Sequence, residues 1–199
     1  MLRLIILSIF ILFISGCGIR TAPITEYKIN TKIQKLDLQK NKMIDKSLKV
    51  SQAFSSNSLM SLKMNYIQDS SKEYTFTQSQ WSQSPNKALT LQMVKLLRST
   101  GLFKSVQVFK SRSKSDLVLE ICVEDFMQYF DKDLTSSYVN IEMTLTLIDT
   151  KDNSIIASKT FYSKLKSRTL DAEGGVEALN MALENILLSS AKWFEEIGR

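Results

Sequence analysis

Alternating apolar and polar positions predict long β-strands in the second half of the chain. Residues 117–126 begin with an apolar side chain at every second position, and residues 138–148 repeat this pattern. Such alternation indicates strands with one buried and one wetter face, as in an antiparallel sheet. A turn-like cluster at residues 149–153 precedes a further strand-like run at residues 155–162. The predicted inward positions are Leu117, Leu119, Ile121, Val123, Val139, Ile141, Met143, Leu145 and Leu147.

Apolar residues at three- and four-residue spacing predict two helices. The first should begin at Pro85, because Ser84 is a natural N-cap and proline suits the first helical position. It should end before Gly101, since glycine readily adopts the left-handed conformation that follows a helix end. The second helix should follow Asp171 and run to Ile197. Gly174 and Gly175 weaken its first turn, and a lone pair of glycines does not indicate a phosphate-binding loop.

The predicted elements combine into one α+β domain over residues 46–199. Three shorter strand-like segments at residues 48–53, 62–67 and 74–77 precede the first helix, and another at residues 103–109 follows it. The predicted order is βββ-α-ββββ-α, an antiparallel β-sheet with two α-helices packed on it. There is no internal repeat and no sign of a second domain.

The N-terminus has the pattern of an export signal. A cationic start at Arg3 is followed by an apolar run over residues 4–14, too short for a transmembrane helix. Ser15 and Gly16 then precede Cys17. This end resembles the lipobox of bacterial lipoproteins, which implies that residues 1–16 are a removed signal peptide and that Cys17 carries the lipid, palmitate included. The alternatives are an uncleaved anchor helix, or an ordinary signal peptide with a chance cysteine.

Residues 17–45 are polar, Lys-rich and weakly periodic, and we expect a flexible basic tether. Residues 27–29 could dock as a short extended piece. The tether could rest on anionic headgroups or stay solvated. Gly18 stands where a sorting Asp would indicate the inner membrane. The expected location is therefore the cell envelope, lipid-anchored in the outer membrane and facing the periplasm, with the inner membrane as the alternative.

Composition excludes several classes of function. The chain has no histidine, so Ser-His-Asp and Cys-His catalytic arrangements and His-bearing zinc sites are excluded. With Cys17 assigned to lipid, Cys122 is alone and cannot form an intramolecular disulfide. The net charge of +6 is mildly basic, and nucleic-acid binding is not expected of an exported lipoprotein. Glu120 with Glu124 and the Asp131–Asp133 turn are more simply solvated than catalytic or calcium-binding, so no enzyme, cofactor or metal is expected.

An ordered set of residues in the middle of the chain carries a family resemblance. Tyr66 ends a strand, Tyr74 and Trp81 follow, the Ser84-Pro85 helix start comes next, and Gly101-Leu102-Phe103 leads into a strand. This order, with the lipobox, resembles the ABC-type transport auxiliary lipoprotein family, whose best-known member is paraquat-inducible protein C. The sequence departs from the family in having fewer prolines between its first strands and one proline rather than two at the helix start.

The resemblance implies a non-enzymatic accessory of an MCE-type ABC system for intermembrane phospholipid transport. Its partners would be the periplasmic MCE-domain protein, the membrane through Cys17 and, as a further option, phospholipid. The candidate partner-binding residues are Trp81, Tyr129 and Phe130, beside the tether and exposed strand edges. Trp81 has an alternative role, stapling the helix start to the core.

Two rival functions stay open at this stage. An assembly factor for another cell-envelope machine would share the same fold class. A lipid-binding module would hold an acyl chain in a dry cavity, and the alternative is that the same residues simply fill the core. The residues concerned are Leu89, Met93, Leu183 and Leu187.

Overall fold

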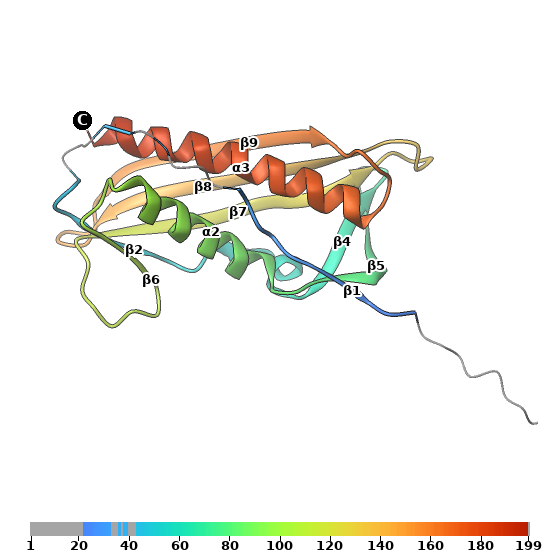
Figure 1. Ribbon diagram of the computed structural model, residues 1–199, viewed down its shortest axis with the longest axis horizontal. Helices are drawn as coiled ribbons and strands as arrows, with labels where there is room; N and C mark the ends of the chain where they lie inside the picture. The colour runs from blue at the N-terminus through green and yellow to red at the C-terminus, as the bar shows by residue number, and fades with distance from the viewer. Residues whose placement is uncertain (1–21, 33–35, 37, 40–42, 199) are drawn as a thin grey trace, which may run out of the picture.

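Two helices cover one face of a single mixed β-sheet in the computed structural model (Figure 1). The structure describes residues 22–32, 36, 38–39 and 43–198. The helices are α2 (Pro85–Thr100) and α3 (Ala172–Ile197). The predicted α+β class with two helices packed on a sheet is confirmed. No helix among the described residues is long and apolar enough to cross a membrane.

The strands follow the predicted order closely. All four strands expected after the first helix are present, and the three expected before it are joined by the very short β1 and β3. The strands are β1 (Thr25–Tyr27), β2 (Ser47–Val50), β3 (Phe54–Ser55), β4 (Lys63–Gln68), β5 (Lys72–Trp81), β6 (Ser105–Val108), β7 (Leu117–Phe130), β8 (Ser137–Asp149) and β9 (Ile155–Lys166), with a 3₁₀ turn, η1, at Asn57–Met60.

β7 is the centre of the sheet and has partners along both edges. β8 pairs antiparallel with it from residue 117 to residue 130. Three strands share the other edge in succession, each parallel to β7: β2 at residues 117–119, β3 at 122–123 and β4 at 128–130. The sheet is therefore mixed, which corrects the predicted antiparallel sheet. The chain reverses in β5, and after α2 both β6 and β7 run parallel to β2.

The predicted inward positions form the core beneath the helices. Val139, Ile141 and Leu145 on β8 have no exposed surface, and Phe194 of α3 is equally buried. The proposed cavity residues of the lipid-binding alternative belong to the same core cluster, where they pack among its other side chains. These residues are Leu89, Met93, Leu183 and Leu187, none more than 2% exposed.

Local signals fix the ends of both helices as predicted. Pro85 is the first residue of α2, and Gly101 follows its end in the left-handed conformation, at φ 66°. Ser84 sits at the N-cap position without a side-chain capping bond. Asp171 does cap α3, because its carboxylate accepts a hydrogen bond of 2.8 Å from Gly174 N. That hydrogen bond is the main reason the pKa of Asp171 is lowered.

Part of the predicted tether is built into the domain. β1 pairs parallel with the end of β5, with Thr25 opposite Ser79 and Tyr27 opposite Trp81. Of residues 27–29, which were expected to dock as a short extended piece, Tyr27 lies in this pairing. The prediction of a flexible tether over residues 17–45 is accordingly corrected for residues 25–31.

We call residues 25–31 the strap, because they run on from β1 between the two helices (Figure 1). Gln92 of α2 donates from Nε2 to Ile29 O at 3.2 Å. Asn30 N donates to Asn180 Oδ1 of α3 at 2.9 Å. Ile29 is 8% exposed and joins the hydrophobic core. The strap thus connects the sheet edge to both helices.

Gly174 and Gly175 are explained by close packing at the start of α3. A Cβ on Gly174 would lie 2.6 Å from Thr169 O and 2.8 Å from Thr169 N, which are backbone atoms. A Cβ on Gly175 would collide with the side chain of Gln128. Gln128 itself donates to Asp171 O at 3.2 Å and to Ser137 Oγ at 3.1 Å. The glycines therefore let α3 approach β7 and the preceding loop.

Truncating Ile29 should destabilise the domain. Ile29→Ala should lower the free energy of unfolding by about 2–4 kcal/mol, because it leaves a void between the strap and the helices. Urea denaturation followed by circular dichroism measures this. Ile24→Ala is the matched control, since Ile24 is 56% exposed, and should change the value by less than about 0.5 kcal/mol. Equal effects of the two changes would contradict the packing of the strap.

Gly174→Ala should also destabilise the domain, by about 1–3 kcal/mol, because Thr169 must move. Helix propensity alone predicts the opposite sign, a gain of about 0.5–1 kcal/mol. The same urea titration decides between them. Asn185→Ala, at an exposed position of α3, should be neutral or slightly stabilising. A stabilising Gly174→Ala would show that the loop yields freely.

Candidate functional site

The structure buries two of the three predicted contact residues. Trp81 is 4% exposed and packs on Phe126, with ring centroids 6.0 Å apart. Its backbone N donates to Leu62 O at 2.8 Å. This placement matches the alternative reading of Trp81, a side chain that fixes the chain to the core just before α2.

Tyr129 and Phe130 point to opposite faces of the sheet, as consecutive strand residues do. Phe130 is 6% exposed on the helix-covered face, in edge contact with Tyr66 at 5.2 Å. Tyr129 is half-buried on the face that carries no helix. Of the three candidates, Tyr129 therefore remains at the surface, and the helix-free face around it is the candidate site.

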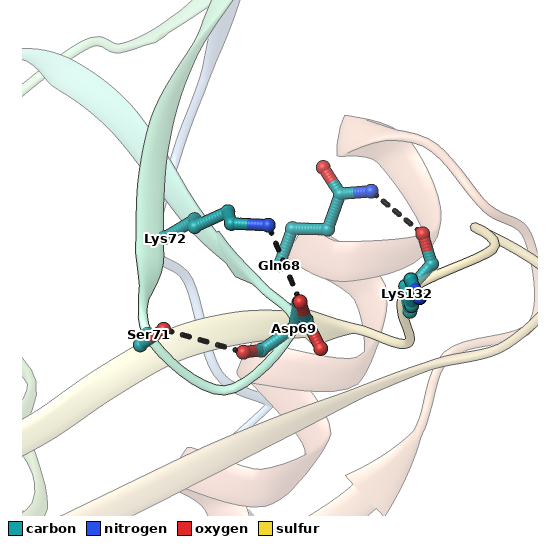
Figure 2. A network of polar contacts seen from close by, with 5 residues as sticks. All are labelled: Gln68, Asp69, Ser71, Lys72 and Lys132. Carbon is teal, nitrogen blue, oxygen red and sulfur yellow. Dashed lines mark hydrogen bonds and ion pairs between the residues drawn. The ribbon is translucent and has the colours of Figure 1, made fainter.

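The turn that follows Phe130 is a hairpin held against the neighbouring β4–β5 turn (Figure 2). Gln68 at the end of β4 donates from Nε2 to Lys132 O at 2.9 Å. In the adjoining β4–β5 turn, Lys72 pairs with Asp69 at 3.2 Å. Asp131 accepts a 2.7 Å bond from Thr135 N and so closes the β7–β8 turn. The Thr135 hydroxyl also donates a hydrogen bond to the Asp131 carboxylate. The hydrogen bonds that Asp131 accepts, above all this one, lower its pKa, and they hold the turn closed.

Tyr129 belongs to a connected set of side chains on the helix-free face. Its hydroxyl donates to Asp125 Oδ2 at 2.8 Å, and Asn140 Nδ2 donates to the same oxygen at 2.7 Å. The Tyr129 ring stacks on Tyr138, with centroids 5.1 Å apart and planes 6° apart. Lys164 Nζ lies 3.9 Å from the centre of the Tyr138 ring. We call these five residues the tyrosine–aspartate cluster.

A β-bulge brings further carboxylates to the cluster. The register of β7 against β8 shifts between Val123 and Asp125, so that Glu124 is the extra residue. Asp125 then lies opposite Glu142, and Glu142 lies opposite Tyr162 of β9. Bulges of this kind re-aim side chains and mark functional edges of sheets. Sequence alternation predicted the wetter face correctly for Glu124, but it carried no signal for the bulge or for Asp125.

Burial dominates the electrostatics of the cluster. It raises the pKa of Asp125, although hydrogen bonds from Asn140 and Tyr129 act in the opposite direction. Burial, followed by the bond to Asp125, raises the pKa of Tyr129. On the exposed Tyr162, the negative charge of Glu142 is the main cause of a raised pKa. The arrangement can accept hydrogen bonds and attract cationic groups.

The face offers little for covalent or metal chemistry. Burial, and then the charge of Glu124, raises the pKa of the Cys122 thiol, which disfavours the reactive thiolate. Glu120 and Glu124 lie at exposed positions. Within the described part of the chain, no group of three or more His, Cys, Asp or Glu side chains is placed to hold a metal ion.

Comparison with known proteins identifies the fold. No family model matches the sequence, and no curated protein sequence matches it. Protein XCC0632 from Xanthomonas campestris, described as family-model DUF330, matches with a TM-score of 0.77, at 19% identity over 87% of this chain and 96% of its own. An uncharacterized protein matches with a TM-score of 0.63, at 15% identity over 86% of this chain and 99% of its own.

A third solved structure is more distant. Hypothetical protein CT253 from Chlamydia trachomatis matches with a TM-score of 0.50, at 8% identity over 77% of this chain and 97% of its own. At such identities the likeness shows a shared fold. The coverage shows that this fold extends over most of each chain.

The raised pKa of Asp125 predicts a pH-dependent effect of substitution. A pKa that is higher in the folded than in the unfolded state means that the fold favours the protonated carboxyl. The stability that this adds is fully present below the unfolded-state pKa and is lost as the pH rises through the folded-state pKa. Ionised Asp125 therefore costs stability at neutral pH. Asp125→Asn keeps an oxygen acceptor without the charge, so its urea midpoint at neutral pH should exceed that of the unsubstituted protein. The difference should shrink as pH falls to about 4, where carboxyl groups take up protons.

Asp133→Asn provides the control, because Asp133 is exposed in the β7–β8 turn. Its urea midpoint should follow that of the unsubstituted protein at both pH values. A lower midpoint for Asp125→Asn at neutral pH would show that the ionised form is the one that the fold favours.

Proposed function

We propose that this chain is a bacterial cell-envelope lipoprotein, acylated at Cys17, that serves as a non-enzymatic accessory of an MCE-type ABC system for intermembrane phospholipid transport. The observation that carries the proposal is the lipobox-like sequence followed by the ordered residues of the auxiliary lipoproteins. The fold supports it, because α2 begins at Pro85 and ends just before Gly101, where that order requires. The similarity in fold to a DUF330 protein is consistent with it.

Cys17 lies outside the described residues, and its role follows from sequence alone. Thr25, the first residue of β1, is the eighth residue after Cys17. At roughly 3.3–3.6 Å per extended residue, this link spans at most about 30 Å. Each lipid methylene buried contributes about 0.8 kcal/mol, so several acyl chains would hold the domain close to its membrane. Gly18 favours the outer membrane, facing the periplasm.

The proposed contact surface for the MCE-domain protein is the helix-free face. Glu124, Asp125 and Glu142 supply acceptors there, next to the stacked pair that contains Tyr129. Tyr162 is 67% exposed beside them, and aromatic side chains of this kind anchor protein interfaces. Such a surface suits the binding of a protein partner and requires no catalytic residues. The lipid-binding alternative loses support, because its cavity residues pack in the core.

Affinity purification tests the proposal. The protein, tagged after Arg199, is recovered from gently solubilised membranes, and all co-purifying proteins are identified by mass spectrometry. We expect an MCE-domain protein with its permease and ATPase. Recovery of secretion, flagellar or pilus components instead would assign the chain to the assembly factors of another envelope machine.

A Cys17→Ser variant provides the companion measurement. Growth with an alkyne-labelled palmitate should label the unsubstituted protein and leave Cys17→Ser unlabelled, and the variant should leave the membrane fraction. Equal labelling of both forms would remove the lipoprotein assignment and, with it, the anchor.

A further inference from the structure

The positive charge of the chain is concentrated in one segment. Residues 74–115 contain seven Lys and Arg residues and neither Asp nor Glu. Because 26 basic residues less these seven leaves 19 against 20 acidic residues, the rest of the chain is almost neutral. The seven are Lys87, Lys95, Arg98, Lys104, Lys110, Arg112 and Lys114.

The fold gathers these cations along one edge of the molecule. All seven are exposed, on the outer side of α2, in the turn after it and in the connection from β6 to β7. α2 packs against β6, and the two lie together at the same side of the sheet (Figure 1). None of the seven forms an ion pair with a described residue. We call α2, β6 and the β6–β7 connection the basic edge.

Exposed apolar side chains lie among the cations. A shallow cavity of about 340 Å³ on the basic edge is lined by Leu91, Val108 and Phe109 together with Lys87 and Lys110. Leu91 is 46% exposed and Phe109 39% exposed. The ammonium group of Lys110 lies 5.7 Å from the centre of the Phe109 ring. Cations flanking exposed apolar groups are typical of surfaces that lie at a lipid headgroup layer.

The strap passes the start of α2, although β1 and β6 lie at opposite ends of the strand order. Tyr27 O, at the end of β1, accepts a 2.8 Å hydrogen bond from Ser82 N, three residues before Pro85 begins α2. Cys17 is only eight residues before β1. A lipid on Cys17 would therefore keep the membrane near the start of α2, the end of the basic edge that carries Lys87. The closeness of the membrane rests on the proposed lipidation of Cys17, whereas the charge pattern of the basic edge is independent of it.

We propose that the basic edge is the surface on which the domain lies against a membrane rich in anionic phospholipid headgroups. Each Lys or Arg near such a surface contributes about 1 kcal/mol of attraction. Leu91 and Phe109 add apolar contact at the headgroup boundary. An acidic protein would satisfy the charges but gives no reason for exposed apolar side chains among the cations.

Vesicle binding of the unacylated mature chain, residues 18–199, tests the inference. This chain contains the whole described fold, which lies within residues 22–198. Flotation with phosphatidylglycerol–phosphatidylcholine vesicles should recover it, and pure phosphatidylcholine vesicles should not. Recovery should fall as salt is added, because salt screens exposed charges. Equal recovery with both vesicle types, or none with either, would overturn the inference.

Matched charge variants locate the surface. Lys87→Gln with Lys95→Gln should weaken binding roughly 25-fold, about five-fold for each cation removed. Lys132→Gln with Lys192→Gln removes the same charge from exposed positions outside the basic edge and should change binding less than about two-fold. Leu91→Ser should weaken binding with the charge unchanged. Circular dichroism confirms that each variant folds.

Two further outcomes separate the inference from the proposed function. Equal weakening by both charge pairs would mean that net charge alone acts, which overturns the assigned surface. Failed vesicle binding, with loss of a co-purifying acidic protein in Lys87→Gln and Lys95→Gln, would assign the basic edge to that protein. Because the vesicle assay contains neither acyl group nor transporter, failure to recover MCE components would leave its result unaffected.

Discussion

The fold depends on the pairing of β7 along both of its edges. Each of its 14 residues has its side chain on one face or the other, while its backbone pairs with β8 on one edge and with β2, β3 and β4 in turn on the other. Backbone polar groups buried in a sheet must be paired, and β7 satisfies them with four different partners. A strand so fixed determines the register of every strand around it.

That register separates the two faces of the sheet. On one face, Leu119, Ile121 and Phe126 of β7 meet the helices and are at most 3% exposed. The bulge at Glu124 turns Asp125 toward the helix-free face and brings Phe126 and Phe130 to the helix-covered one. The same extra residue sets Asp125 opposite Glu142. A local irregularity in the ladder thus both preserves the core and gathers carboxylates on the helix-free face.

Much of this arrangement could be predicted from the sequence, because its causes are local. The alternation of β7 and β8, the proline start of α2 and the Asp171 cap of α3 each act within a few residues. The parallel pairing of β2, β3 and β4 could not, since it depends on how the chain returns from β5 to the start of β7 rather than on any strand's own pattern. β3 has two residues and carries no periodicity of its own.

The site was harder to predict for the same physical reason. Trp81, Tyr129 and Phe130 are all aromatic side chains near loops, and only burial distinguishes a core aromatic side chain from a surface one. Adjacent positions such as Tyr129 and Phe130 have the same sequence environment but opposite faces. The hydrophobic pattern does not predict the position of the strap, because its backbone is hydrogen-bonded to the side chains of Gln92 and Asn180, which are distant in sequence.

Charge and topology together give the domain two surfaces of different character. The cations of the basic edge follow α2 and β6, whereas Glu124, Asp125 and Glu142 lie on the face of the sheet that α2 does not cover. A domain resting on anionic lipid through α2 would leave those carboxylates free for a protein partner, and the membrane would repel the carboxylates themselves. The strap adds a mechanical link, because any force on a lipid at Cys17 would reach the sheet through the β1–β5 pairing. Anchor, membrane contact and partner contact would then act on three different parts of one domain.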